Sequence, residues 1–316
     1  MFAGFANIWT IVGLGRDVVP GALVPLRVAG ERILLFRDER GAIAALIDRC
    51  PHRGVALSLG KLRDGIVECP FHGWRFDGRG QACHVPWNPD AKLAHLGATA
   101  LPVRETAGLI WLYTGFAPKD EPQPMDVLMR DGVVLCGQSA AWNVHWTRAM
   151  ENMLDSPHLP FVHRRTIGRF LAPYLDRRMD LSWTPRPYGA QITGQVGEDR
   201  PPSRLDYRFP NAMELFIDPP GKIMHMIAVC LPEDETTTRL SIYTVRNFAR
   251  SRLLDPVFRW SNGRIAREDK AVLETSLPNE VPPAGEEKSV RTDAPTLAFR
   301  KIYFDRLKGS KAGGCP

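Results

Sequence analysis

The sequence predicts an α+β fold in two parts: a small all-β domain, then an antiparallel sheet with helices packed on it. Three observations lead to this prediction. Short apolar runs separated by tight turns fill the first third of the chain, apolar and polar residues alternate over 191–247, and a helical pattern with clear ends covers 255–276. A charged, proline-rich stretch at 117–124 marks the boundary between the two parts. We therefore expect domains at 1–117 and 118–316.

The predicted strands of the first domain are short and closely spaced. They cover 34–37, 42–47, 65–68 and 109–113. Turn-forming residues such as Asp77-Gly78 lie between them and allow the chain to reverse direction within a few residues. Strands of this length at this spacing are typical of a small all-β domain.

The predicted helices of the second domain have recognisable ends. Residues 147–155 look helical because Met150, Met153 and Leu154 form one apolar stripe. The later helix, 255–276, starts at an Asp-Pro pair, and a further proline lies just past its end. We expect both helices to pack against the antiparallel sheet.

The bulk composition limits the classes of function. The chain has 316 residues and a net charge of +6, but its basic residues are scattered, so we expect no nucleic-acid partner. No apolar run is long enough to cross a bilayer, and no basic segment precedes the apolar start of the chain. We therefore expect no membrane span and no signal peptide, and a cytoplasmic protein is the simplest interpretation.

The cysteines do not form a disulfide pattern. Six cysteines are too few for a disulfide framework in a chain of this length. Two of them lie beside histidines at metal-ligand spacing. The other four are expected to be buried free thiols: Cys83, Cys136, Cys230 and Cys315.

Two short loops carry one cysteine and one histidine each. Cys50 and His52 form C-x-H, sixteen residues intervene, and Cys69 and His72 form C-x-x-H. Two thiolates and two imidazoles suit a 2Fe-2S cluster with both cysteines on one iron and both histidines on the other. Structural zinc uses the same ligand types, but zinc fingers usually place the cysteines in one half and the histidines in the other. In this chain each loop has one cysteine and one histidine, and this arrangement favours the 2Fe-2S cluster over zinc.

A second group of metal-ligand residues spans 152–163. Asn152, Asp155 and His158 are three residues apart, so a helix places them on one side. Prolines on both sides of His158 are expected to end the helix, so that His163 can reach the same metal from a turn. Two histidines near a carboxylate suggest part of an iron site that leaves positions open for O2 and substrate. Two ordinary histidines near a helix end are the alternative.

The missing carboxylate ligand is expected on the helix 255–276. Asp269 falls on the apolar stripe of this helix, four residues after Ile265. A carboxylate on a buried face is costly unless it binds a cation or a hydrogen-bond donor. Glu268 and Glu274 lie off the stripe and are expected to be solvated. Asp269 is therefore the predicted third ligand, and an aspartate paired with a neighbouring basic side chain is the alternative.

Taken together, these motifs resemble those of the Rieske non-heme iron oxygenases. The flanking pairs Arg53-Gly54 and Gly73-Trp74 also match that family. Respiratory Rieske proteins usually carry a second cysteine in each cluster loop, and neither loop of this chain has one. The resemblance implies an N-terminal all-β Rieske domain followed by a helix-grip catalytic domain.

The resemblance also implies roles for the second group of residues. His158 and His163 would ligate the mononuclear iron, and the family takes its carboxylate ligand from a late helix, in agreement with Asp269. Asp155 would bridge the two redox centres by contacting His158 and a cluster histidine of an adjacent chain. Asn152 would lie beside the iron.

An activity and a set of partners follow from the same resemblance. A Rieske 2Fe-2S cluster together with mononuclear Fe(II) implies a terminal oxygenase that uses O2 and receives electrons from NAD(P)H through a reductase, with or without a ferredoxin. The resemblance also implies a ring-shaped homotrimer. The chain looks most like the monooxygenases of the phthalate-oxygenase and pheophorbide-oxygenase branches. This implies hydroxylation or oxidative demethylation of a small apolar or aromatic substrate.

Other functions stay open on the sequence. They are ring cis-dihydroxylation, a Rieske electron carrier without mononuclear iron, and a colourless zinc protein. The candidate pocket residues are apolar and are also candidates for the core: Ile167, Phe170, Met213, Leu215, Met224 and Met226. Arg165 or Arg169 could hold a substrate carboxylate, although a surface position is the simpler interpretation for both.

Overall fold

The computed structural model describes residues 1–2 and 4–309, so Cys315 lies outside the described part of the chain. The chain divides into two compact units, Met1–Pro122 and a second that begins at Gln123. Each unit is described by itself. The domain boundary expected between residues 117 and 118 lies in the same connecting segment and stays a prediction.

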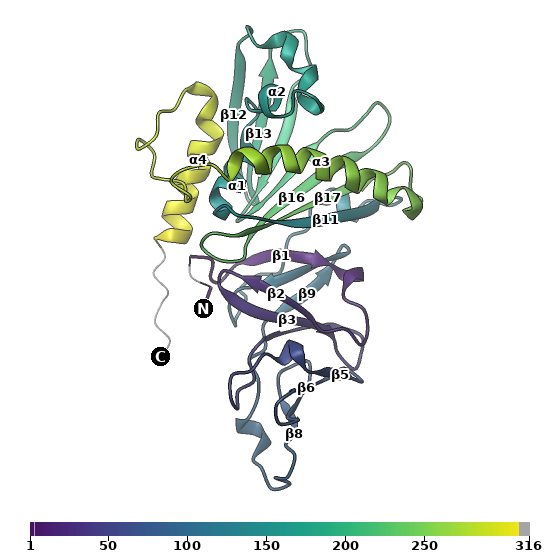
Figure 1. The fold of residues 1–316 in the computed structure, drawn as a ribbon. Coiled ribbons are helices and arrows are strands. Elements are labelled where there is room, and N and C mark those ends of the chain that lie inside the picture. Colours follow the sequence, from purple (N-terminus) through teal and green to yellow (C-terminus); the bar gives the residue numbers. More distant parts are fainter. Residues whose placement is uncertain (3, 310–316) are drawn as a thin grey trace. The chain divides into compact units, whose positions relative to one another are not determined.

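The first unit consists of small antiparallel sheets, as the sequence predicts (Figure 1). One sheet has the order β1 (Trp9–Leu14), β10 (Leu109–Tyr113) and β9 (Val103–Thr106). The next contains β2 (Val24–Val28), β3 (Glu31–Arg37) and β4 (Ile43–Ile47). The last contains β5 (Lys61–Arg63), β6 (Ile66–Glu68), β7 (Arg75–Phe76) and β8 (Ala82–His84).

The core of this unit lies directly behind the two cysteine-histidine loops. Alternate residues of β3, Leu34 and Phe36, point inward and are fully buried, as the period of a strand requires. Cys50 and Cys69 belong to the same buried cluster of side chains. The two loops are therefore anchored at their cysteines to a buried apolar core.

The second unit is built on one antiparallel sheet of seven strands (Figure 1). Their order is β11 (Val134–Trp142), β17 (Thr238–Arg246), β16 (Met224–Pro232), β15 (Ala212–Phe216), β14 (Ser203–Arg208), β13 (Gly189–Val196) and β12 (Met179–Arg186). The sequence-based prediction of alternation over 191–247 covers the central strands. It misses the two edge strands, β11 and β12. The predicted α+β class is confirmed.

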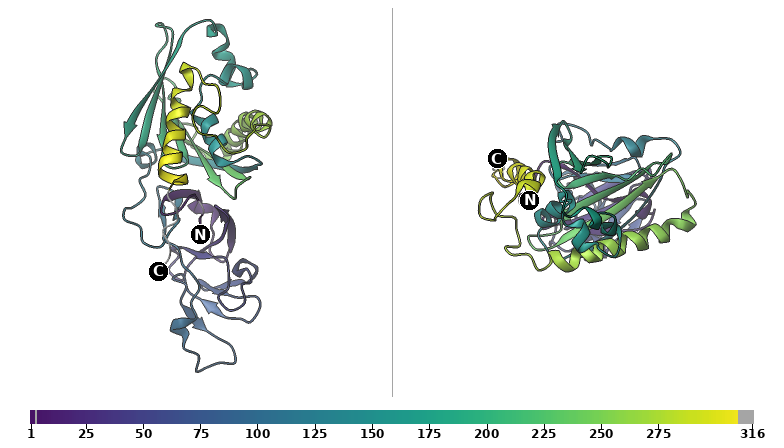
Figure 2. Two further views of the ribbon diagram at one scale, coloured as in Figure 1. Left: turned by 90° about the vertical axis from the view of Figure 1, so that its left-hand side faces the viewer. Right: turned by 90° about the horizontal axis from the view of Figure 1, so that it is seen from above.

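Four helices accompany the sheet. They are α1 (Trp146–Leu154), α2 (Leu159–Val162), α3 (Asp255–Leu273) and α4 (Ala294–Ile302). The α1 helix contacts β15, β16 and β17, whereas α3 contacts β11 and α4 contacts β12. Figure 2 shows α4 (yellow) beside the sheet.

Short 3-10 turns connect the longer elements. They are Gly15–Asp17, Leu57–Leu59, Leu93–His95, Asp126–Met129, Ile167–Phe170, Ala172–Tyr174, Arg252–Leu254 and Arg291–Asp293, and a π-helical turn, Tyr303–Lys308, continues α4. None of the described helices is long and apolar enough to cross a membrane.

The α1 helix is fixed at both ends. The side chain of His145 accepts a hydrogen bond from the Thr147 backbone N–H and caps the start. The helix ends at Leu154, before Pro157. Arg148 donates a hydrogen bond of 2.6 Å to Glu287, and this partly exposed ion pair connects the middle of the helix to the segment before α4. The residues that follow α1 therefore start from a well-defined position.

The cysteines outside the loops differ in their burial. Cys136 and Cys230 are buried free thiols, as expected. The expectation is wrong for Cys83, which is exposed. Cys83 lies on β8, a three-residue strand at the edge of its sheet, and nothing covers its outer side enough to bury it.

Candidate metal centres and pocket

The two cysteine-histidine loops have matching backbone geometry. Cys50 directly follows the turn after β4, and its N–H donates to Val55 O at 2.8 Å, while Gly54 N–H donates back to Cys50 O at 2.9 Å. The second loop repeats this pattern: Cys69 N–H donates to Trp74 O at 2.8 Å, and Gly73 N–H donates to Cys69 O at 3.1 Å.

A glycine closes each loop because the backbone there is left-handed. Gly54 has φ 74° and Gly73 has φ 69°, a region that residues with a Cβ rarely adopt. Each loop is therefore a tight turn that begins at a cysteine and is closed by a glycine. The sequence shows this as the glycine that follows each cysteine by four residues.

The four side chains form a buried sulfur pair and an outer histidine pair. Cys50 and Cys69 are 2% and 3% exposed, and the rings of His52 and His72 lie 4.7 Å apart between centroids. Trp74 stacks on His52 at 4.6 Å, which holds the plane of that ring. The Nδ1 atom of His52 is buried without a hydrogen-bond partner.

This arrangement fits a 2Fe-2S cluster. Burial raises the pKa of the Cys50 thiol to about 11, and the neighbouring Cys69 adds to the shift. Two buried sulfur atoms that face each other need a nearby positive charge before they can ionise, and iron supplies one. The separate sulfur and imidazole pairs match a cluster with both cysteines on one iron and both histidines on the other.

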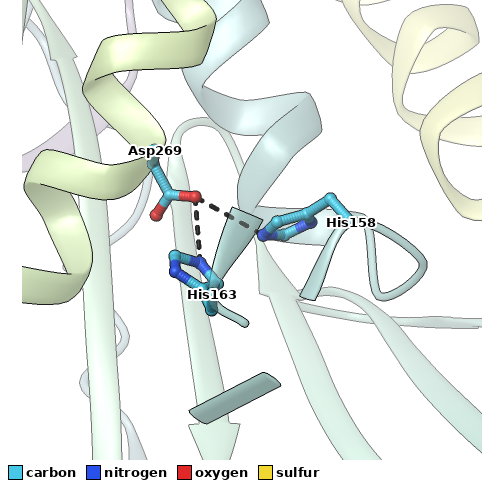
Figure 3. Close-up of side chains that lie close together, drawn as sticks. All are labelled: His158, His163 and Asp269. Atoms are coloured by element: carbon cyan, nitrogen blue, oxygen red, sulfur yellow. Dashed lines mark ion pairs between the residues drawn. The ribbon is translucent and has the colours of Figure 1, made fainter. Parts of the chain in front are cut away.

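The second candidate centre joins three side chains that are far apart in the sequence. His158 and His163 lie at the two ends of the short helix α2, and Asp269 lies on α3. Their potential ligand atoms are within 4.8 Å of one another, and no other such group of three occurs in the described residues. Figure 3 shows both imidazoles pointing toward the Asp269 carboxylate.

A close backbone contact sets the position of α2. The turn that begins at Ile167 packs against the helix, and a Cβ on Gly168 would lie 1.8 Å from Leu159 O. Only glycine fits there, so the residue is needed for the chain to fold back over α2. This packing places His163 under cover, with 1% of its surface exposed.

The geometry of the three side chains suits a metal ion. Asp269 Oδ1 lies 3.0 Å from His163 Nε2 and 3.5 Å from His158 Nε2. This oxygen is buried and accepts no hydrogen bond of acceptable geometry. Two imidazole nitrogens and one carboxylate oxygen that converge in this way are the ligand set of non-heme iron sites. The structure therefore brings together the three residues predicted as ligands.

The charges around the site reinforce one another. Burial disfavours charge on His158, but the neighbouring carboxylates of Asp155 and Asp269 outweigh it and raise its pKa to about 9. Burial likewise opposes ionisation of Asp269, and the two histidines overcome it and lower its pKa to about 2. Asp269 is therefore an ionised carboxylate, as a metal ligand must be.

Two further carboxylates lie on the outer side of the histidine rings. Asp155 Oδ2 is 3.4 Å from His158 Nδ1, and Glu268 Oε2 is 2.9 Å from His163 Nδ1. The expectation that Glu268 is solvated is wrong, because its carboxylate also accepts a hydrogen bond from Thr166 at 2.7 Å. The sequence hides this role, since the partner histidine precedes Glu268 by 105 residues.

A mostly apolar pocket of about 180 Å³ adjoins the three side chains. Asn152 and Asp155 line it beside the histidines, and the Asn152 Nδ2 group is buried without a partner. The apolar lining comes from α1 and α2, from the segment after His163, from one face of the sheet and from α3: Met153, Leu159, Ile167, Leu171, Met179, Leu181, Ile192, Val196, Leu205, Met213, Leu215, Met226 and Ile265.

The sequence identifies part of this lining. Ile167, Met213, Leu215 and Met226 are among the lining residues, but Phe170 and Met224 are not. Phe170 ends the short 3-10 turn Ile167–Phe170 and is 59% exposed, so it is not part of the buried wall. The sequence-based candidates do not include Met179 and Leu181, because the strand β12 that carries them was not predicted. Neither Arg165 nor Arg169 lines the pocket.

Comparison with known protein families gives two matches that together span most of the chain. The family described as "Rieske [2Fe-2S] domain" matches residues 8–97. The family described as "Vanillate O-demethylase oxygenase C-terminal domain" matches residues 142–307, which is more than half of the chain. The first match contains both cysteine-histidine loops, and the second contains the three convergent side chains.

Curated relatives match over a large part of this chain. Chlorophyllide a oxygenase of Chlamydomonas reinhardtii is 30% identical over 260 residues, which is 75% of this chain and 37% of that protein. The 4beta-methylsterol monooxygenase of Methylococcus capsulatus is 29% identical over 259 residues, 74% of this chain and 66% of that protein. The chain thus spans less than two thirds of the length of these relatives.

Solved structures share the fold at low sequence identity. A crystal structure of dicamba monooxygenase bound to dicamba has a TM-score of 0.80 at 23% identity, covering 96% of this chain and 97% of that chain. NdmA of Pseudomonas putida with caffeine has a TM-score of 0.81 at 21% identity, covering 94% and 90%. These matches agree with a β-rich first unit followed by a sheet-and-helix unit.

Proposed function

The chain belongs to the Rieske oxygenase family, and from that premise we propose that it is a terminal oxygenase acting on a small apolar or aromatic substrate. The proposed reaction uses O2 and electrons from NAD(P)H to hydroxylate the substrate or to remove a methyl group oxidatively. One observation carries the proposal: His158, His163 and Asp269 converge at a pocket in a chain that also has both cluster loops.

The second metal centre separates this function from electron transfer alone. A Rieske electron carrier needs the loops of Cys50 and Cys69 but has no use for a buried carboxylate between two imidazoles. Leaving Asp269 Oδ1 buried without a donor is costly unless a cation lies beside it. The apolar pocket next to these side chains has room for a small organic molecule.

We assign a role to each residue of the two centres. Cys50, His52, Cys69 and His72 hold the cluster, and His158, His163 and Asp269 hold the mononuclear iron. When bound, the cluster supplies single electrons and the ferrous ion supplies open positions for O2 and substrate.

The remaining steps concern what the chain itself does. Asp155 Oδ2 lies 3.4 Å from His158 Nδ1, on the edge of the ring opposite to Nε2, and its negative charge favours the orientation with Nε2 toward Asp269. In the proposed homotrimer, Asp155 also contacts His72 of an adjacent chain. The buried Asn152 amide offers donors on the pocket side. The apolar walls exclude water from the reacting centre.

The pocket wall supports the proposed substrate class. Among the described lining residues, only the side chains of the metal site and Asp155 can carry a charge. Away from the metal site, a substrate carboxylate would find no lysine or arginine in the lining and would lose its hydration on entry. We therefore propose an uncharged substrate whose apolar part lies against the methionine and leucine side chains of the sheet.

The relatives favour oxygenation by insertion of a single oxygen atom. Their names include a methylsterol monooxygenase and a dicamba O-demethylase oxygenase component. A 3-chlorobenzoate-3,4-dioxygenase subunit, 32% identical over 149 residues, keeps cis-dihydroxylation as the second candidate. For electron supply we propose an NAD(P)H-dependent reductase, with or without a ferredoxin, and we propose a cytoplasmic location.

A substrate screen under labelled O2 tests the proposal. The holoprotein is given a surrogate reductase, NADH and a panel of neutral aromatic ethers, N-methyl compounds and alicyclic compounds, each paired with a carboxylate analogue. We expect products with one labelled oxygen atom or products that have lost a methyl group, and none from the carboxylates. Products with two labelled oxygen atoms and two added hydrogens would establish dihydroxylation instead.

A further inference from the structure

We propose that Glu268 is a positioning residue of the mononuclear metal centre, where it holds the His163 ring with Nε2 toward the metal. The inference rests on the proposed function, because it assigns His163 as a ligand. Glu268 and Asp269 are consecutive residues of α3, yet they contact opposite edges of the same ring. Glu268 Oε2 lies 2.9 Å from Nδ1, and Asp269 Oδ1 lies 3.0 Å from Nε2.

The contacts around Glu268 form a small closed network. Its Oε2 atom accepts a hydrogen bond from Thr166 Oγ1 at 2.7 Å in addition to the bond with His163. The Thr166 hydroxyl also lies 3.3 Å from the carbonyl oxygen of His163. Thr166 therefore ties the Glu268 carboxylate to the backbone of the residue that the carboxylate orients.

The chemistry of the partner decides which imidazole nitrogen can bind a metal. A neutral imidazole carries one N–H, and its other nitrogen has the lone pair that a metal needs. An ionised carboxylate only accepts hydrogen bonds, so it requires the proton to sit on Nδ1. Nε2 is then free to bind a metal. A side chain at residue 268 that donated to Nδ1 would favour the opposite tautomer.

The two histidines of the centre differ in how firmly this chain holds them. His158 Nδ1 lies 3.4 Å from Asp155 and has no hydrogen bond of acceptable geometry, although it is buried. His163 has a bond of 2.9 Å and is almost fully covered. Within one chain, Glu268 is therefore the stronger of the two orienting carboxylates, and its loss should loosen the site most.

Metal binding by the holoprotein tests the role directly. The cluster is kept, the mononuclear site is emptied by mild chelation, and Co(II) is titrated while its visible absorption bands are followed. We expect Glu268→Ala to weaken Co(II) binding by about 10- to 100-fold and to change the band pattern. Glu268→Gln, which keeps the shape and can accept a weaker bond, should lie between it and the wild type.

Two controls define the result. Glu274→Gln, at the C-terminal cap of the same helix and outside both the ligand group and the pocket lining, should bind Co(II) as the wild type does, and His163→Ala gives the baseline for binding outside the site. Wild-type affinity and unchanged bands in both Glu268 variants would overturn the positioning role. Wild-type protein that binds no more Co(II) than His163→Ala would instead contradict the proposed function itself.

Discussion

Two clusters of histidine and carboxylate side chains lie in the unit that begins at Gln123, and only one has the geometry of a metal centre. The first is His158, His163 and Asp269. The second is His225, whose Nδ1 lies 2.8 Å from Glu214 Oε1 and whose Nε2 lies 3.3 Å from Asp218 Oδ2. Both clusters are largely buried and have similar composition, so residue content does not separate them.

The direction of the side chains separates the two clusters. His225, like His163, has a carboxylate at each edge of its ring, but in the described residues no second histidine converges on either carboxylate, and Arg208 pairs with Glu214 at 2.7 Å. Its polar atoms are therefore already satisfied. In the first cluster, two Nε2 atoms meet at one carboxylate oxygen that has no donor. A metal site therefore differs from a structural ion pair in two ways: its ligand atoms point at one place, and its buried carboxylate oxygen has no hydrogen-bond donor.

The two clusters also use opposite faces of the same sheet. Leu215 and Met226 line the pocket. Their neighbours Glu214 and His225 precede them by one residue in β15 and β16, so they point to the other face. The charged cluster thus stabilises the sheet from behind while the apolar face forms the pocket.

The largest expected difference is between two histidine-to-alanine variants. His163→Ala removes a proposed ligand, so we expect loss of the mononuclear iron and a fall in product formation of at least ~100-fold. His225→Ala should keep the iron but lose roughly 1–3 kcal/mol of stability, because Glu214 and Asp218 lose a buried partner. Iron analysis and thermal unfolding measure the two effects. Loss of iron in His225→Ala would break the comparison.

A smaller difference is expected at the bridging carboxylate. Asp155→Asn should leave both metals bound, since Asp155 contacts His158 only from the outer side at 3.4 Å. Product formation should fall by about 10- to 100-fold, because the orientation of His158 and the proposed contact with His72 of an adjacent chain are both weakened. Steady-state turnover and iron content check this, and wild-type turnover would contradict the bridging role.

The contrast between the two sheet faces gives a third prediction. A Cβ on Gly194, which lines the pocket, would lie 2.7 Å from Ser203 Oγ and 3.1 Å from Leu181 Cδ2. Gly194→Ala should therefore raise KM about 10-fold for the larger substrates found in the screen and leave iron content unchanged. Thr193→Ala, one residue earlier and on the other face, is the control. Equal effects of the two variants on KM would argue against the assigned pocket wall.

The smallest expected effect concerns an ionic network that belongs to the fold alone. Hydrogen bonds from Arg148 and Arg300 hold the pKa of Glu287 at about 2, against a usual value of 4.5. A lowered pKa stabilises the fold above pH 4.5, and this contribution is lost as the pH falls from 4.5 toward 2. Because Glu287 is partly exposed, we expect only ~1 kcal/mol.

The pH dependence of unfolding isolates this contribution. Glu287→Gln should unfold at a lower temperature than the wild type near neutral pH, and the gap between the two should close on acidification. Turnover near neutral pH should be unaffected. A gap that stayed constant down to pH 3 would contradict the assigned ion pairs.

The candidate ligands could be predicted from the sequence because each lies in a short local pattern. Cys50, His52, Cys69 and His72 lie in short loops whose spacing alone predicts a ligand set. Asp269 followed from helix periodicity, because a carboxylate on an apolar stripe needs a partner. The fold class followed from strand and helix patterns and from the family resemblance, and the structure confirms it.

What the sequence did not reveal depends on contacts between distant elements. The role of Glu268 requires that α3 pack against the segment that carries His163 and Thr166, and helix periodicity contains no information about that neighbour. The edge strand β12 is a different case: Met179, Leu181 and Trp183 alternate with polar residues there, so the signal was present and the expected alternation simply began too late, at residue 191. The pocket wall formed by Leu181 was therefore missed. Likewise, nothing local distinguishes His225 from a ligand.

The central claim is that one chain carries two different iron centres. Iron and acid-labile sulfide analysis of the reconstituted wild type and of His163→Ala tests it most directly. We predict about three irons and two sulfides per chain in the wild type, and about two irons with unchanged sulfide in the variant. A wild type with only about two irons beside an intact Rieske spectrum, or a variant with the same iron content as the wild type, would contradict the claim.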